Sequence, residues 1–187
     1  MDQKIIFYFL FSIFSFQFSY GDIINYEAKG NLESKMPINC VDINKVNNFN
    51  TPADIFVGVS DCVNNERYQE AGKLLVLATT YGNYDTRRVE DRTAHQASPV
   101  LFKQLVTSID EDRRKKLFTE FKNEVSNNKN ICASIKKLGK PNYYPAYMIQ
   151  HGMGAFLGKK SKDGLVSNFD PEYAWENTLK EFLNCTN

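Results

Sequence analysis

The chain opens with an almost unbroken run of apolar residues. Positions 5–18 read IIFYFLFSIFSFQF, after a short start that contains Asp2 and Lys4. Ser19-Tyr20-Gly21 then places small residues at both positions that a signal peptidase reads. Because the run is too short for a comfortable membrane span, residues 1–21 are predicted to be a cleavable secretory signal.

The apolar pattern changes at position 51. Residues 22–50 mix polar and isolated apolar residues without a sustained period, and are predicted to be an N-terminal arm with one short helix near Cys40. From Thr51 onward apolar residues recur at helical spacing, and no stretch alternates like a strand. Residues 51–187 are therefore predicted to form an all-α helical domain.

The first two helices are predicted to form an antiparallel hairpin. Thr51 can cap the first helix, and Asp54 lies near the positive end of its dipole. Asn64-Asn65 is the predicted turn, and Gly82 is expected to end the second helix. The apolar stripes are Ile55, Phe56, Val59, Cys62 and Val63 in the first helix, then Tyr68, Ala71, Leu74, Leu75, Ala78 and Tyr81 in the second.

Capping signals predict further helices along the rest of the chain. These are a helix from Asp85 to about Ala97, one capped by Ser98-Pro99, one opened by a Ser108–Glu111 capping box, and shorter ones over 132–138 (ending at Gly139), over 145–152 and from Asp170-Pro171 on. The predicted fold is a single-domain multi-helix bundle of antiparallel helical hairpins, stapled by two disulfides.

All four cysteines follow the predicted cleavage point. They are Cys40, Cys62, Cys132 and Cys185. An even number in an exported chain indicates two disulfides, and four cysteines allow three pairings. Pairing within each half, Cys40 with Cys62 and Cys132 with Cys185, is preferred because it is local. Zinc ligands usually come in closely spaced pairs, so neither a metal nor a cofactor is predicted. The predicted location is periplasmic or extracellular.

The charge is nearly balanced, with 23 Lys and Arg residues against 22 Asp and Glu residues. Nucleic acid is not an expected partner, because binding phosphates needs a surplus of positive charge. A polybasic membrane anchor is not expected either, so no membrane contact is predicted after signal cleavage. The oligomeric state stays open.

The densest polar segment is 81–96 (YGNYDTRRVEDRTAHQ). In a helix that starts at Asp85, one stripe would carry Arg87, Asp91 and His95, and the next would carry Tyr84, Arg88 and Arg92. One hypothesis is a recognition face whose arginines bind carboxylates or phosphates of a partner. A second has Asp91 orienting His95 as a general base. The third is a solvated helix with intrahelical ion pairs.

A second cluster covers 142–156 (NYYPAYMIQHGMGAF). It brings Tyr143, Tyr144, Tyr147 and His151 together with methionines and glycines. Such a mixture can form an adaptable binding patch. The alternative is a core helix in which the methionines fill gaps and the glycines allow close packing.

Motifs of known enzymes are missing from the sequence. It contains no glycine-rich phosphate loop, no HExxH, no GxSxG and no CxxC. This favours a binding protein over an enzyme. Asn184-Cys185-Thr186 fits the N-glycosylation pattern.

The region from Ala53 to Gly82 resembles one tetratricopeptide-type unit, because Tyr68, Ala71, Ala78 and Tyr81 fall where its two helices would pack. No later segment recurs at the period of about 34 residues, which favours a generic helical hairpin. In outline the whole chain is similar to small helical periplasmic proteins of the immunity or inhibitor type. That similarity implies a protein partner, most concretely an exported toxin or hydrolase that the chain neutralises. The alternatives are an exported hydrolase that uses His95 with Asp91, and a structural accessory protein without a separate site.

Overall fold

The computed structural model describes residues 28–158 and 162–185, so the predicted secretory signal lies outside the described residues. The elements of this part are helices, and an isolated backbone bridge joins Val89 and Leu165. Disulfides link Cys40 to Cys62 and Cys132 to Cys185, which is the preferred pairing. The predicted all-α bundle with two disulfides is thus confirmed.

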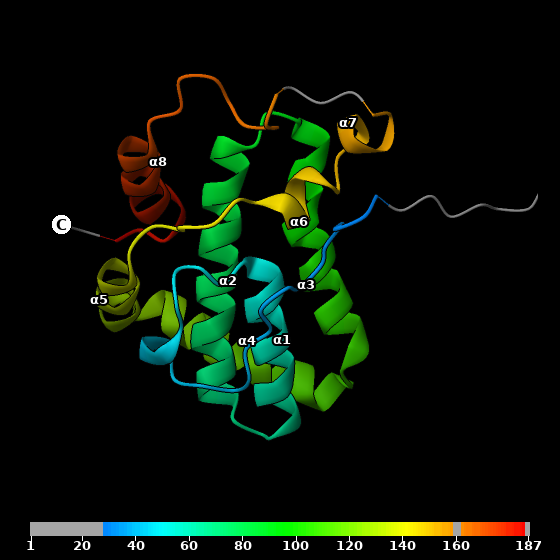
Figure 1. The fold of residues 1–187 in the computed structure, drawn as a ribbon. Coiled ribbons are helices and arrows are strands. Elements are labelled where there is room, and N and C mark those ends of the chain that lie inside the picture. Colours follow the sequence, from blue (N-terminus) through cyan, green and yellow to red (C-terminus); the bar gives the residue numbers. More distant parts are fainter. Residues whose placement is uncertain (1–27, 159–161, 186–187) are drawn as a thin grey trace, which may run out of the picture.

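Helices α1 (Pro52–Asn64) and α2 (Tyr68–Arg88) form the predicted hairpin at the centre of the bundle (Figure 1). The cap of α1 is the predicted one: Thr51 Oγ1 accepts from the Asp54 backbone N–H, and Asp54 Oδ2 accepts from the Thr51 backbone N–H. The hairpin supplies much of the core, because its apolar faces are shielded from solvent by the surrounding helices. Its fully buried side chains include Ile55, Val59, Val63, Leu74, Leu75, Leu77, Tyr81 and Tyr84.

The predicted end of α2 at Gly82 is wrong. The helix runs six residues further, to Arg88, and Gly82 is buried within it. A Cβ atom on Gly82 would lie 2.2 Å from Oγ of Ser98 in α3 (Ala97–Ser108). Glycine is needed here because two helices approach closely, and not because the helix ends.

The helix predicted from Asp85 to Ala97 is also absent. The chain leaves α2 at Val89 in extended conformation, then forms the 3-10 helix η2 (Arg92–Gln96), which leads into α3. The backbone pairs instead with a distant segment: Glu90 N–H donates to Gly164 O at 3.0 Å, and Val166 N–H donates to Arg88 O at 2.9 Å. Ser98-Pro99 consequently lies inside the first turn of α3 and does not cap it.

Helix α4 (Glu111–Ser126) lies behind the hairpin and begins one residue after its cap, Asp110 (Figure 1). The predicted Ser108–Glu111 capping box is wrong. The Ser108 hydroxyl donates to Leu105 O in α3, whereas Asp110 accepts from the Arg113 backbone N–H at 2.9 Å.

The later helices follow local signals more closely. Helix α5 (Lys129–Leu138) ends at Gly139, whose φ of 86° is the left-handed geometry that glycine favours. Helix α8 (Pro171–Asn177) starts after its cap Asp170 and continues as a π-helical turn, η3 (Thr178–Phe182). The single helix predicted over 145–152 is replaced by two one-turn helices, α6 (Ala146–Ile149) and α7 (Met153–Phe156).

The described part of the arm, residues 28–50, crosses the bundle and contains the 3-10 helix η1 (Ile43–Lys45). Asp54 of α1 holds it, because Ser34 Oγ and the Met36 backbone N–H both donate to Asp54 Oδ1 at 2.8 Å. Further along the bundle, the Leu32 backbone N–H donates to Tyr147 O. The arm therefore links α1 to α6.

Candidate functional site

The two polar clusters of the sequence meet inside the protein, around Asp85. This carboxylate has no exposed surface. Nε and Nη2 of Arg88 lie 2.7 and 2.6 Å from its Oδ1. The hydroxyls of Tyr143 and Tyr147 donate to its Oδ2 at 2.9 and 2.8 Å. Three hydrogen bonds and the ion pair with Arg88 thus engage both oxygens of the Asp85 carboxylate with groups of the protein itself.

The Arg88 guanidinium contacts two aromatic rings and a backbone carbonyl as well as Asp85. It lies 5.1 Å from the centroid of the Tyr84 ring and 4.9 Å from that of Tyr143, both within cation–π range. Its Nη1 donates to Tyr143 O at 2.8 Å. Arg88 thereby fixes the segment before α6 against the end of α2, which is a structural role.

Burial controls the ionisation of this cluster. It raises the pKa of Asp85, while the charge of Arg88 and the tyrosine hydroxyls act in the opposite direction. Burial, and then the charge of Asp85, raise the pKa values of Tyr143 and Tyr147 well above the ordinary value. The two phenols therefore remain protonated and act as donors to the carboxylate.

The hypothesis that Asp91 orients His95 finds no matching geometry. His95 Nε2 lies 2.9 Å from Val89 O. Asp91 Oδ1 accepts from the backbone N–H and hydroxyl of Thr93, and Asp91 Oδ2 accepts from the Gly154 backbone N–H at 2.8 Å. No hydrogen bond joins the two side chains among the described residues. Asp91 instead holds α7.

The other predicted partner-binding residues are spread over different environments. Tyr84, Arg88 and Tyr147 are buried, which corrects their assignment to a recognition surface. Tyr84 and Arg88 lie on the buried side of α2, which continues to Arg88, and Tyr147 is a buried residue of α6. The others lie nearer the surface: Arg87 pairs with Glu181 at 2.8 Å, His151 Nδ1 lies 2.8 Å from Asn31 Oδ1, the Tyr144 hydroxyl donates to Asp163 O, and Arg92 is exposed.

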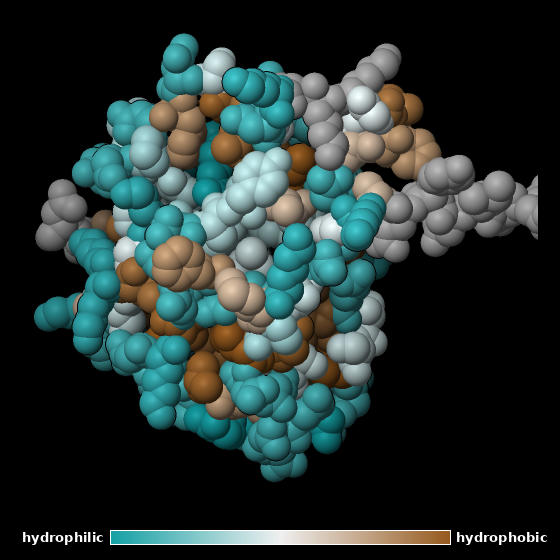
Figure 2. Space-filling model, in the orientation of Figure 1, coloured by the Kyte–Doolittle hydropathy of each residue, from teal (hydrophilic) through white to brown (hydrophobic). Residues whose placement is uncertain are grey.

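An exposed apolar turn lies at the end of the second cluster, for which a binding patch and a core helix were the alternatives. Met153, Phe156 and Leu157 are 51%, 52% and 57% exposed, and α7, which carries the first two, stands at the edge of the bundle (Figure 1). Hydrophobic residues gather over this helix in Figure 2. A sequence signal existed, because these three residues have the spacing of one helical turn.

Two hydrogen bonds anchor this apolar turn. The Met153 backbone N–H donates to Thr93 Oγ1 at 2.8 Å, and Gly154 N–H donates to Asp91. Gly152 brings the chain close, since a Cβ atom there would lie 2.4 Å from Asp91 Oδ2. The orientation of α7 is thus set by the segment that opens η2.

No group of three or more His, Cys, Asp or Glu side chains within residues 28–158 and 162–185 could hold a metal ion. Over the same ranges, no helix combines the length and apolar character needed to cross a bilayer.

In comparisons with known proteins, no family model, no curated protein and no solved structure matches the chain.

Proposed function

We propose that this is an exported protein that binds a protein partner through α7, acting as an inhibitor of an exported toxin or hydrolase. The observation that carries the proposal is the apolar turn of Met153, Phe156 and Leu157, each more than half exposed. The polar clusters that suggested chemistry in the sequence are occupied with internal hydrogen bonds. Binding therefore accounts for the molecule better than catalysis does.

Physical chemistry makes the turn a suitable anchor. Burying a side chain such as phenylalanine contributes about 1.5–3 kcal/mol, and binding energy at interfaces concentrates in a few aromatic and large apolar residues. Hydrogen bonds from Met153 and Gly154 to the segment 91–93 hold the turn before any partner arrives. A surface that is already ordered loses less conformational entropy on binding.

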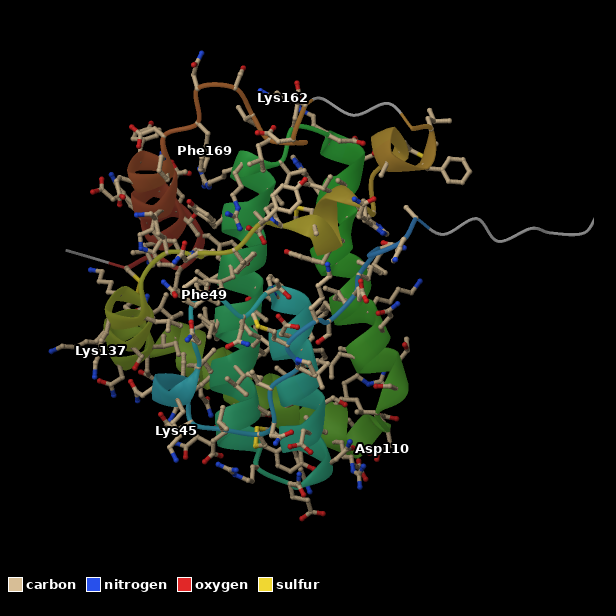
Figure 3. All side chains as sticks on the ribbon, viewed as in Figure 1. Lys45, Phe49, Asp110, Lys137, Lys162 and Phe169 are labelled. Carbon is tan, nitrogen blue, oxygen red and sulfur yellow. A yellow bond between two sulfur atoms is a disulfide. The ribbon has the colours of Figure 1, made fainter. Side chains whose placement is uncertain are left out.

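Exposed basic residues in the segment that anchors the apolar turn and in the loop after it could form the polar rim of an interface. Arg92, between the two residues that anchor α7, is exposed and forms no ion pair with another described residue. Lys162, which Figure 3 labels on the loop that follows α7, is also exposed. An apolar centre with charged residues around it is the usual composition of a non-obligate protein interface.

Two matched phenylalanines allow a sharp test. Phe156→Ser should weaken partner binding by about 2 kcal/mol, or roughly 30-fold, the scale of an interface hot spot. Phe182→Ser is the control, because Phe182 is similarly exposed at 45% but belongs to η3. Both variants should keep the helical circular dichroism spectrum and thermal midpoint of the unchanged protein.

The partner is identified with a photo-crosslinking residue at position 157 and, as a control, at position 173. The crosslinked protein is purified, its dissociation constant is measured for both phenylalanine variants, and its enzymatic activity is titrated with the unchanged chain. Equal binding by Phe156→Ser and Phe182→Ser would remove α7 from the interface. A partner that is bound but keeps full activity would contradict the inhibitor role and leave the binding role in place.

A further inference from the structure

The C-terminal end of the protein forms a polar cleft between α5 and α8. Its volume is about 500 Å³. The residues that line it are Lys136, Tyr173, Glu176, Asn177, Leu179, Lys180, Asn184 and Cys185. Six of these eight side chains carry hydrogen-bonding groups other than sulfur, and Tyr173 is 64% exposed. A hydrated, polar group attached at the rim would find room and hydrogen-bonding partners here.

Asn184 lies at this rim with its side chain exposed. Its backbone has a φ of 54°. Two hydrogen bonds fix this backbone, because Asn128 Nδ2 donates to the carbonyl oxygens of Leu183 and Asn184. No hydrogen bond engages the side-chain amide of Asn184 within the described chain. The sequence Asn184-Cys185-Thr186 is the acceptor pattern for N-linked glycans, although Thr186 lies beyond the described residues.

We propose that Asn184 is an N-glycan acceptor when the chain passes through a secretory pathway. In the reaction, Asn184 Nδ2 attacks the anomeric carbon of a polyprenyl-diphosphate-linked oligosaccharide. A carbon–nitrogen bond forms, the carbon–oxygen bond to the diphosphate breaks, and the proton that the amide loses is taken up by the departing polyprenyl diphosphate. The oligosaccharyltransferase of the pathway catalyses the step. This inference goes beyond the proposed function and shares only the requirement for export with it.

The disulfide imposes an order on this modification. Cys185, the middle residue of the pattern, is buried and bonded to Cys132 of α5. A transferase needs the acceptor segment exposed, and the closed bridge holds Cys185 against the bundle. Glycan transfer therefore precedes closure of the bridge, and the two events compete. Partial glycosylation of Asn184 is the expected result.

The test uses the full chain, expressed in insect or mammalian cells and recovered from the medium. A second construction replaces residues 1–21 with an established leader, so that a failure of the predicted signal is not mistaken for a failure of the acceptor. Intact mass is measured before and after N-glycosidase, which converts a glycosylated Asn184 to aspartate. Asn184→Gln should lose the glycan completely, and Asn168, exposed but without the pattern, should remain unmodified.

A paired cysteine variant tests the competition. Cys132→Ser together with Cys185→Ser keeps an acceptor pattern, leaves no free thiol from this bridge, and should raise the glycosylated fraction. An unmodified Asn184 in the protein secreted with the established leader, and in the paired variant, would overturn the proposal. An unchanged glycosylated fraction in the paired variant would overturn the predicted order. Partner binding is measured separately with Phe156→Ser, so either proposal can fail alone.

Discussion

Asp85 and Arg88 form a buried ion pair within the last turn of α2, with Nη2 of Arg88 2.6 Å from Oδ1 of Asp85. Only 10% of the Arg88 side chain and none of the Asp85 side chain is exposed. Through Tyr143 and Tyr147 the pair also fixes a segment more than fifty residues further along the chain. The end of α2 is thus defined by tertiary contacts.

Removal of one member of this pair should be costly. Arg88→Met leaves the Asp85 carboxylate buried without a counter-charge, and the free energy of unfolding should fall by about 3–5 kcal/mol. Urea unfolding measures the loss. Asp85→Leu combined with Arg88→Met removes both charges and should be less destabilised than the single variant. A double variant that is less stable than Arg88→Met would contradict this account.

The same variant has a predictable pH dependence. Burial raises the pKa of Asp85, and loss of Arg88 removes the main opposing charge, so the pKa should rise further. A carboxyl group with a raised folded-state pKa binds its proton more tightly when folded, so stability increases as the pH falls through that pKa. Arg88→Met should therefore be much less stable than the unchanged protein at pH 7, and this difference in stability should become smaller as the pH is lowered to about 4. Thermal midpoints across this range measure it.

Asp91 should show the opposite dependence. Burial alone would raise its pKa, but hydrogen bonds from Thr93, Gly154 and Ala94 hold the pKa below the ordinary value. Its contribution is present above the unfolded-state pKa of about 3.9 and disappears as the pH falls through the lower folded-state pKa. Asp91→Asn should lower the free energy of unfolding by about 1 kcal/mol at pH 7. Its curve of stability against pH should converge with that of the unchanged protein in acid, and parallel curves would contradict the prediction.

Gly82 tests close helix packing. Alanine has the higher helix propensity by about 1 kcal/mol, yet its Cβ would collide with Ser98. Gly82→Ala should therefore lower the free energy of unfolding by about 1–3 kcal/mol, the usual cost of overpacking. Combining it with Ser98→Gly removes the colliding atoms and should recover stability. Equal losses in Gly82→Ala with and without Ser98→Gly would show that the contact is not the cause.

The two disulfides should stabilise the protein unequally. Cys40–Cys62 spans 22 residues and Cys132–Cys185 spans 53. Loop-closure entropy assigns them about 3 and about 4 kcal/mol respectively. Paired serine variants, one for each bridge, separate the two contributions in guanidinium unfolding. A larger loss of stability on removing the shorter bridge, Cys40–Cys62, would contradict this prediction and would point to an effect on the folded state.

Local signals predicted the elements whose ends are decided locally. The caps Thr51 and Asp170 and the terminator Gly139 involve hydrogen bonds and dihedral angles within a few residues, and each was found. Gly82 was misinterpreted because Ser98 meets it across the bundle. The helix expected from Asp85 to Ala97 does not form for a similar reason, since the backbone there is hydrogen-bonded to the segment around Leu165.

The candidate site was predictable only in part. The sequence indicated that the two polar clusters mattered, and the structure joins them. The sequence could not show that Asp85, which was expected only to start a helix, lies at their centre. Nor could it show that Asp91 bonds to α7 and that His95 bonds to Val89 O. For Met153 and Phe156 the sequence left a binding patch and a core helix as alternatives, because apolar spacing does not distinguish a buried face from an exposed one.

The bridge between Cys132 and Cys185 encloses α7 and the loop that follows it. A protease that cut after the exposed Lys162 would leave two pieces joined through sulfur. The cleaved protein would gain only the mass of one water and would separate into two pieces only when a reductant was added, and α7 would remain attached to the bundle through Asp91 and Thr93. A single cut in this loop would therefore alter the covalent chain without releasing the binding surface proposed above.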